Sequence, residues 1–380
     1  MPALPLELVR QIVEDVVDDV NDPVYYRHLS VVSLTSRLLR HEAQRILFRD
    51  SGDLLTTSAA LKKTTMFLDI IISSPERLAL YVKFFDIVFD EWLCPESDET
   101  TALVQKLAKA LGAMRNVKSL EIVSRTIGLR SLPTILPDTY FKLTSFRWSS
   151  HSNDMSESTD VKVDFLRRQD KIEHMKILGF IDVNALKSMS ADILPYLRSL
   201  CLTYSVTETL LPGRENITSL RWVAPFVDPT PPPHPNLDAE FPSDPETISR
   251  ELSRIKYLSY GATNSTAPAP SIQRIAPFLT GLVCLETCRG DVKELEALSQ
   301  LPRLEVLVLP KEAGGLMPTM HEMIKVATSC KKLEQIDFED DNGRIHSFEY
   351  CHSSKTPQIN TLEESEWYLW INDHDEFDDD

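Results

Sequence analysis

The chain has 380 residues, of which 42% are apolar and 26% are charged, and this apolar content is enough for a sizeable core and excludes wholesale disorder. Its formal net charge of −17 disfavours binding to nucleic acid or to an anionic membrane surface. Nine acidic residues lie in the last 18 positions, 363–380, which contain no Lys or Arg. The remaining 48 acidic and 40 basic residues give a net charge of −8, so the body is only mildly acidic and ends in an acidic tail.

The cysteine content and the N-terminus both indicate an intracellular protein. Six cysteines are too sparse for a disulfide framework, so we expect reduced thiols. The first 20 residues carry five acids and a single Arg, which is unlike a signal peptide. The longest apolar run, 66–72, is too short to cross a bilayer. We therefore expect a protein of the cytoplasm, the nucleus or both, without a membrane partner.

The first 50 residues are predicted to form a small all-helical unit. Pro5 suits the first turn of a helix. Three apolar residues then recur at every fourth position and define one helix face: Leu8, Ile12 and Val16. An Asn-Asp-Pro break at 21–23 ends this helix, and helical patterning resumes over 29–39 and 43–48. Residues 51–80 are expected to be a helical linker or N-terminal cap.

A short motif, apolar-x-x-apolar-x-apolar, recurs from residue 81 onward. Its ten instances begin at Val82, Val117, Leu143, Ile172, Leu197, Ile217, Ile255, Leu282, Leu304 and Leu333. Most spacings are 20–29 residues, the period of leucine-rich repeats, and helical patterns lie between the motifs. Because no single repeat can bury its own apolar face, the repeats should stack. An ordinary α/β domain is the alternative.

The predicted fold is an α/β solenoid. The short N-terminal helical unit is followed over residues 81–345 by irregular leucine-rich repeats, with parallel strands on the concave side and helices on the convex side. Such repeats commonly place Asn or Cys just after the strand, and few such residues are present here, Cys288 among them, so we expect the turns to be satisfied otherwise. Eight prolines within 224–246 exclude helix or ladder strand, which leaves an extended loop or a docking segment. Residues 346–380 form a C-terminal segment that ends in the acidic tail.

The first 50 residues resemble an F-box of the expanded fungal type, a family in which irregular leucine-rich repeats often follow the box. The matching residues are Leu4, Pro5, Leu8 and Ile12 in the first segment and Leu34 and Leu39 in the second, with Leu39 at a position where the family often has Trp. The resemblance implies that these residues dock a Skp-type adaptor, which joins a cullin scaffold. It further implies that the repeats hold a target protein for ubiquitin transfer.

No sequence motif indicates catalysis. Nucleophile elbows, phosphate-binding glycine loops and paired zinc-ligand histidines are not found. Cys284 and Cys288 are expected on the concave side, but no second pair stands at zinc-site spacing, so we interpret them as ordinary thiols. We therefore expect no enzyme activity, no cofactor and no metal site.

The concave face is the predicted target-binding surface. In each strand the residues that flank the central apolar position should point to it, and these are basic in the middle of the array, at Arg147, Lys176 and Arg221, and acidic towards its end, at Glu286 and Asp337. The pattern favours an acidic or phosphorylated target segment on the middle repeats, and a solvated mixed-charge face is the alternative. The predicted function is that of a substrate-recognition subunit of an SCF-type ubiquitin ligase. The second hypothesis is a repeat scaffold without a ligase role, whose N-terminal helices only cap the array.

Overall fold

The computed structural model describes residues 5–15, 25–89, 98–124, 136, 141–150, 160–178, 186–223, 245–261, 272–287, 296–309, 319–339, 344–351 and 356–362. The chain forms two compact units, Met1–Glu157 and Ser158–Asp380. None of the helices described has both the length and the apolar character that a bilayer span requires.

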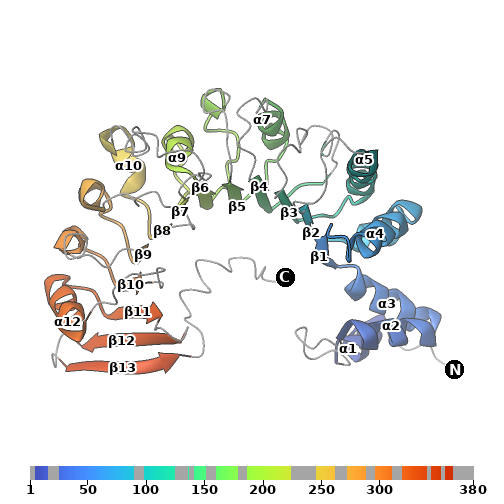
Figure 1. Cartoon of the computed structure of the whole chain (residues 1–380), viewed down its shortest axis with the longest axis horizontal. Helices are drawn as coiled ribbons and strands as arrows, with labels where there is room; N and C mark the ends of the chain where they lie inside the picture. The colour runs from blue at the N-terminus through green and yellow to red at the C-terminus, as the bar shows by residue number, and fades with distance from the viewer. Residues whose placement is uncertain are drawn as a thin grey trace. The chain divides into compact units, whose positions relative to one another are not determined.

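The first unit begins with three short helices that pack into a bundle (Figure 1). They are α1 (Leu6–Asp15), α2 (Tyr25–Thr35) and α3 (Arg37–Leu47). Ser36 separates α2 from α3, because its side chain accepts a hydrogen bond from the Leu39 amide at 3.1 Å and so caps the N-terminus of α3. Each helix contributes one fully buried residue to the centre of the bundle: Val13, Leu29 and Ala43. The predicted all-helical unit is therefore present, with a small core of its own.

Four parallel strands in sequence order follow the bundle in the described part of this unit. They are β1 (Asp50–Leu55), β2 (Phe84–Phe89), β3 (Ser119–Ser124) and β4 (Ser145–Ser150). Between them lie α4 (Leu61–Ser73), η1 (Ala79–Tyr81) and α5 (Asp98–Ala113). The strand β1 was not predicted, because its residues lack the repeated motif and a bulge between Asp50 and Asp53 interrupts its pairing with β2. Residues 51–80 thus contain strand as well as helix.

The second unit continues the same arrangement. Its described parallel strands are β5 (His174–Leu178), β6 (Ser199–Leu202), β7 (Ser219–Val223), β8 (Tyr257–Gly261), β9 (Cys284–Thr287), β10 (Val306–Leu309) and β11 (Gln335–Glu339). Two antiparallel strands follow, β12 (Ile345–Cys351) and β13 (Thr356–Leu362). The helical segments are α7 (Asp160–Arg167), α9 (Tyr204–Leu210), η3 (Pro245–Ile248), α10 (Ser249–Leu252), η4 (Ile272–Arg274), η5 (Ala276–Phe278), η6 (Leu298–Gln300) and α12 (Met320–Ser329). These segments lie on one side of the strands (Figure 1).

All ten predicted motifs are strands, and each strand begins two residues after the first apolar residue of its motif. The motif's second and third apolar residues then point towards the helices, as Leu120 and Ile122 do in β3, where both are fully buried. Sequential parallel strands alternating with short helical segments make the chain an α/β solenoid of the leucine-rich-repeat type, as predicted. The proline-rich segment 224–246 and the acidic tail 363–380 fall almost wholly outside the described residues.

One backbone hydrogen-bond pattern recurs at the start of most of the described repeats. The carbonyl group just before one strand accepts hydrogen bonds from two successive amides of the next repeat. The Lys83 carbonyl, for example, accepts from the amides of Lys118 and Ser119 at 2.8 and 3.0 Å. The carbonyl of Lys256 binds the amides of Val283 and Cys284 in the same way. Because the pattern repeats, it fixes the register, so residues at equal positions form rows across the strands.

Asparagine side chains also join neighbouring repeats, but they precede the strand instead of following it. Asn116 Nδ2 donates to the carbonyl oxygen of Leu80 at 2.7 Å, and Asn216 Nδ2 donates to that of Pro195 at 2.8 Å. Both asparagines stand immediately before the first apolar residue of a motif. In these two repeats an Asn before the strand, and not one after it, binds the backbone of the preceding repeat.

At Gly281 the backbones of two repeats lie close together. A Cβ atom at this position would collide with the backbone carbonyl of Ser253. We expect Gly281→Ala to lower the stability of the second unit by about 1–3 kcal/mol, because the backbones must move apart. Chemical unfolding measures this. Gly112→Ala in α5 is the matched control, since a Cβ there meets nothing within 4 Å, and it should be neutral or mildly stabilising. Equal stability of the two variants would contradict the expectation.

Candidate protein-docking surfaces

Helix α1 has more apolar surface than is buried within the helical bundle. Val9 and Val13 are buried, with 1% and 0% of their surfaces exposed. The neighbouring pair Leu8 and Ile12 retains 46% and 45% exposure. The periodicity places Leu8 and Ile12 on a single apolar face, but in the structure the adjacent valines close the bundle and the predicted pair lies on the surface.

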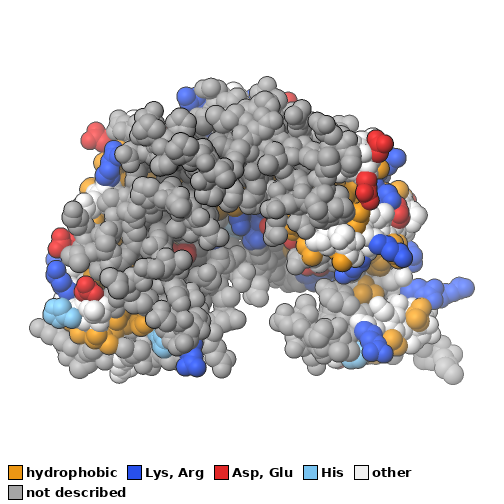
Figure 2. Space-filling view, in the orientation of Figure 1, with side chains coloured by type: hydrophobic (Ala, Val, Ile, Leu, Met, Phe, Trp, Pro, Cys, Tyr) orange, Lys and Arg blue, Asp and Glu red, His pale blue; other side chains and the backbone are white. Residues whose placement is uncertain are grey.

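Helices α2 and α3 also present large apolar side chains to solvent. These are Val31, Leu34 and Leu38, of which Leu34 is the most exposed at 75%. Figure 2 shows hydrophobic side chains on the visible surface of this bundle, at the lower right. Leu39 differs from the other predicted docking residues that the structure describes, because it packs against the bundle core and its neighbour Leu38 is exposed instead. Pro5 is exposed, and Leu4 and Val16 lie outside the described residues.

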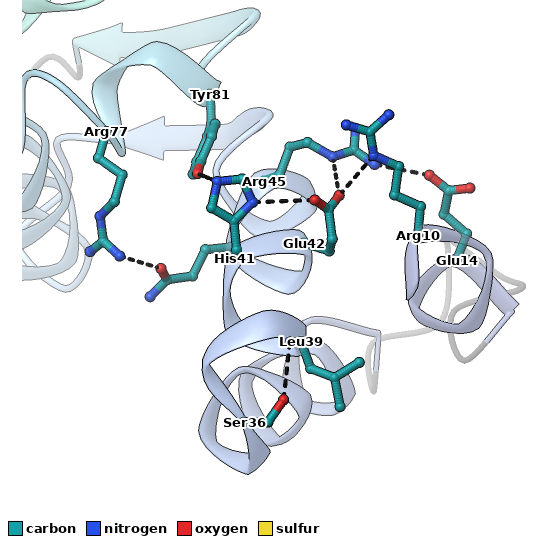
Figure 3. Close-up of polar contacts among 10 residues, drawn as sticks. Arg10, Glu14, Ser36, Leu39, His41, Glu42, Arg45, Arg77 and Tyr81 are labelled. Atoms are coloured by element: carbon teal, nitrogen blue, oxygen red, sulfur yellow. Dashed lines mark hydrogen bonds and ion pairs between the residues drawn. The ribbon is translucent and has the colours of Figure 1, made fainter. Parts of the chain in front are cut away.

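A buried carboxylate holds α1 and α3 together (Figure 3). The side chain of Glu42 is fully buried, and it accepts from Arg45 Nε at 2.8 Å and lies 3.3 Å from Arg10 Nε. Arg45 also reaches across to Glu14 of α1 at 3.0 Å. This network ties the first helix to the third through charge-assisted hydrogen bonds, which are stronger than neutral ones.

The same network continues from α3 to the segment that enters the sheet. His41 Nδ1 lies 3.2 Å from Glu42, and its Nε2 lies 2.9 Å from the Tyr81 hydroxyl in η1. A neutral imidazole protonated at Nδ1 satisfies both bonds, since it donates to the carboxylate and accepts from the hydroxyl. A second link joins the Arg77 guanidinium to Gln44 at 3.1 Å. The bundle therefore contacts the first repeats through α3 and not through the exposed leucines.

The environment of Glu42 favours its charged form. Burial alone would raise the pKa of this carboxyl, but hydrogen bonds from Arg45 and His41 and the positive charges of Arg45 and Arg10 outweigh burial and lower the pKa below its ordinary value. Glu42 is therefore a structural anion at neutral pH, and it stabilises the bundle that carries the exposed apolar residues.

In the first unit the predicted basic residue Arg147 lies on the strand face opposite the helices and is paired with an acidic residue. Arg147 of β4 stands beside Glu121 of β3 in the register, and the two side chains form an ion pair at 3.2 Å. Both are about three-quarters buried. Arg147 thus lies on the predicted face, with part of its charge already balanced within the chain.

In the second unit the register places the other predicted residues in one row. Lys176, Cys201 and Arg221 occupy equal positions on β5, β6 and β7. The row continues on β8 to β11 through residues that include Glu286 and Asp337. Lys176 and Arg221 are half-buried, whereas Glu286 and Asp337 are buried, with 4% and 0% exposure. The predicted basic and acidic residues of this unit therefore share one face.

No family model matches this chain, and no curated protein matches it. Among solved structures, it is similar to a Bacteroides fragilis protein solved by a structural genomics consortium, with 13% sequence identity and a TM-score of 0.37 over 74% of this chain and 84% of that one. A likeness at this level says nothing about function.

Three features of these surfaces were missed from the sequence. The first is that Val9 and Val13 of α1 pack in the bundle core, whereas Leu8 and Ile12 are exposed. A finer count of apolar positions would have found it, because both pairs are spaced i, i+4. The second is the Glu42 network, which had no sequence signal. The third is the depth at which Glu286 and Asp337 are buried, since charged residues are seldom fully buried.

Proposed function

We propose that this protein is a non-catalytic substrate-recognition subunit of an SCF-type ubiquitin ligase, whose helical bundle docks a Skp-type adaptor and whose repeats bind a target protein. The coarser part of this statement, a repeat protein suited to protein interaction, follows from the fold. The finer part rests on the resemblance of the first 50 residues to an F-box and on the surface of the bundle.

One observation carries the docking proposal. The bundle has its own core and its own contacts to the first repeats, yet Leu8 and Ile12 remain nearly half exposed. Contiguous exposed apolar surface on a small unit commonly marks an interaction site. A partner that packs an apolar helix or groove on α1 would bury these side chains, as adaptor docking requires.

The alternative is a repeat scaffold whose N-terminal helices serve only as a cap. The contacts of α3 to Tyr81 and Arg77 favour a capping role, and capping is compatible with docking because the two use different residues. A capping role alone does not explain why Leu8 and Ile12 of α1 are exposed. Adaptor binding therefore separates the two functions.

We expect the double variant Leu8→Asp with Ile12→Asp to lose adaptor affinity by at least about tenfold, because full burial of an apolar side chain contributes about 1.5–3 kcal/mol and each of these half-exposed residues would gain about half of that. Titration of the purified chain with a purified Skp-type adaptor measures this. The matched control is Met66→Asp with Ile70→Asp, a pair with the same spacing and similar exposure on α4, which should bind normally. An intact chain that does not bind the adaptor would exclude the proposal.

The target-binding half of the proposal assigns the middle strands to an acidic or phosphorylated segment. Lys176 and Arg221 lie in one row on the face away from the helices, and Arg147 lies on the corresponding face of the first unit. If the double variant Arg147→Ala with Arg221→Ala captures target as well as the intact chain does, this assignment fails.

A further inference from the structure

Strand β13 (Thr356–Leu362) lies at the end of the sheet. It pairs with β12, and its other edge has no partner strand in the part of the chain that the structure describes (Figure 1). An edge strand presents unpaired amide and carbonyl groups, which can pair with a strand of another chain. Natural proteins usually block such edges with charged residues, prolines or bulges. Whether β13 can bind a partner therefore depends on how well its edge is blocked.

The hydrogen bonds of β12 show which of its backbone groups face β13. The amide of Tyr350 donates to the carbonyl oxygen of Glu334, the residue just before β11, at 2.8 Å. Backbone groups of successive residues point to opposite sides of a strand, so the groups of Ser347 and Glu349 point away from β11. Ser347 and Glu349 therefore belong to the residues of β12 that form hydrogen bonds with β13.

The register separates the inner and outer backbone groups of β13. Gln358 and Asn360 lie opposite the two β12 residues that point away from β11, so their amide and carbonyl groups bond with β12. The alternate residues of β13 point their backbone groups to the open edge: Pro357, Ile359 and Thr361. Proline has no amide hydrogen, so the donors that the strand presents at this edge are the amides of Ile359 and Thr361.

The edge of β13 is blocked only weakly. Its sequence, Thr-Pro-Gln-Ile-Asn-Thr-Leu, contains no charged residue. Its pairing with β12 is continuous over the whole strand, so no bulge twists the edge away. Pro357 removes one donor, but it stands near one end of the strand and leaves the rest of the edge able to pair.

The strand is complementary to a second copy of itself. Ile359 is the midpoint of Thr356–Leu362, so two antiparallel copies centred on Ile359 overlap over the whole strand. The two Ile359 residues then exchange both of their backbone hydrogen bonds. In the same register each Thr361 amide donates to the Pro357 carbonyl of the other copy. The missing amide of Pro357 costs this interface one bond on each side, and the other outward donors are satisfied.

The charges that flank the strand favour the same arrangement. Lys355 stands one residue before β13 and Glu363 one residue after it. Antiparallel pairing about Ile359 sets Lys355 of each copy opposite Glu363 of the other, and opposite charges at such positions stabilise paired strands. Parallel pairing in register would instead set Lys355 opposite Lys355. Antiparallel pairing also separates the two acidic C-terminal sequences, because they follow the strand at opposite ends of the interface.

We infer that this protein forms a homodimer in which β13 pairs antiparallel with β13 of a second copy. The interface uses the same surface of both copies, as a closed two-fold dimer requires. The inference goes beyond the proposed ligase role, since it requires neither an adaptor nor a target. The double variant Leu8→Asp with Ile12→Asp should therefore dimerise normally.

Sedimentation equilibrium of the purified full chain measures the association, in about 0.15 M salt so that the net negative charge of the two copies is screened. We expect a monomer–dimer equilibrium. Thr361→Pro should raise the dimer dissociation constant at least about tenfold, because the two-fold symmetry removes the Thr361 hydrogen bond twice. The fold should persist, since this amide does not pair with β12 and Pro357 already occupies an equivalent position. Thr361→Val, which keeps the amide, is the matched control and should dimerise normally.

Exchange of the flanking charges tests the register without altering the strand. Lys355→Glu alone and Glu363→Lys alone each set like charges opposite one another twice, so each should weaken the dimer by about three- to tenfold. The double variant Lys355→Glu with Glu363→Lys restores opposite charges and should dimerise as the intact chain does. The two single variants change the net charge in opposite directions, so a loss shared by both cannot arise from net charge.

Hydrogen exchange identifies what covers the edge. The amides of Ile359 and Thr361 should be protected in the dimer and should exchange freely in the monomer. An intact chain that stays monomeric would overturn the inference. Protected amides in that monomer would show that the chain covers its own edge, and unprotected ones would leave the edge to a strand of another protein. Equal association of Thr361→Pro and Thr361→Val, or a double charge variant no stronger than the single ones, would also overturn it. If Thr361→Pro lowers the unfolding midpoint, the charge variants alone decide.

Discussion

Leu285→Ala should lower the stability of the second unit by about 2–5 kcal/mol, among the largest losses for any single substitution there. Leu285 is fully buried at the centre of β9, and in the register it lies between Leu258 and Leu307 on the adjacent strands. Truncation removes buried apolar surface and opens a cavity that backbone-bonded neighbours cannot close. Because Leu285 packs between residues of the two adjacent strands, its truncation affects the packing of three repeats.

Chemical unfolding of the intact chain, followed by circular dichroism, measures this loss. Met320→Ala is the control, since Met320 is 39% exposed and its truncation should change stability by less than about 0.5 kcal/mol. A loss below 1 kcal/mol for Leu285→Ala would mean that the strand interior is not packed as described.

Glu42→Gln should destabilise the N-terminal bundle by about 2 kcal/mol at neutral pH, because it removes the buried charge that binds Arg10 and Arg45. The two arginines keep part of their solvation, so the loss should be smaller than for a fully buried ion pair. Hydrogen exchange of the α1 and α3 amides, measured at increasing urea concentration, reports the stability of the bundle and so measures the effect.

The pH dependence of this difference follows from the lowered pKa of Glu42. Folding favours the charged carboxylate, so its contribution is present above the ordinary carboxyl pKa of 4.5 and is lost as the pH falls through the lower pKa of the folded state. The gap between the intact chain and Glu42→Gln should therefore shrink below pH 4.5. Glu14→Gln, an exposed partner of Arg45, should show only a small effect at any pH. A gap that stays constant down to pH 2 would contradict the assignment.

The repeat strands could be predicted from the sequence because their signal is periodic and redundant. Val82, Val117 and eight further motifs obey one pattern, and each predicted strand is present. Strand β1 escaped because its pairing with β2 is set by its neighbour and not by an apolar pattern of its own. Asn116 and Asn216 escaped for a similar reason, since their acceptors belong to a preceding repeat that is distant in sequence.

The surfaces were predicted in outline but not in burial. Periodicity places Leu8 and Ile12 on one face of α1, but whether that face or the one with Val9 and Val13 closes the bundle depends on how α1 packs against α3. The alternation of β9 and β11 places Glu286 and Asp337 on one face, but the depth of the row depends on what packs over it. Both are tertiary properties, which no local pattern encodes.

Affinity purification of the tagged chain from its own cells, followed by mass spectrometry, tests the central claim most directly. The intact chain should recover a Skp-type adaptor and a cullin together with a target. The double variant Leu8→Asp with Ile12→Asp should lose the adaptor and cullin but keep the target, and Met66→Asp with Ile70→Asp should keep all three. Recovery of a target by the intact chain without any adaptor or cullin would contradict the ligase role and leave the repeat scaffold.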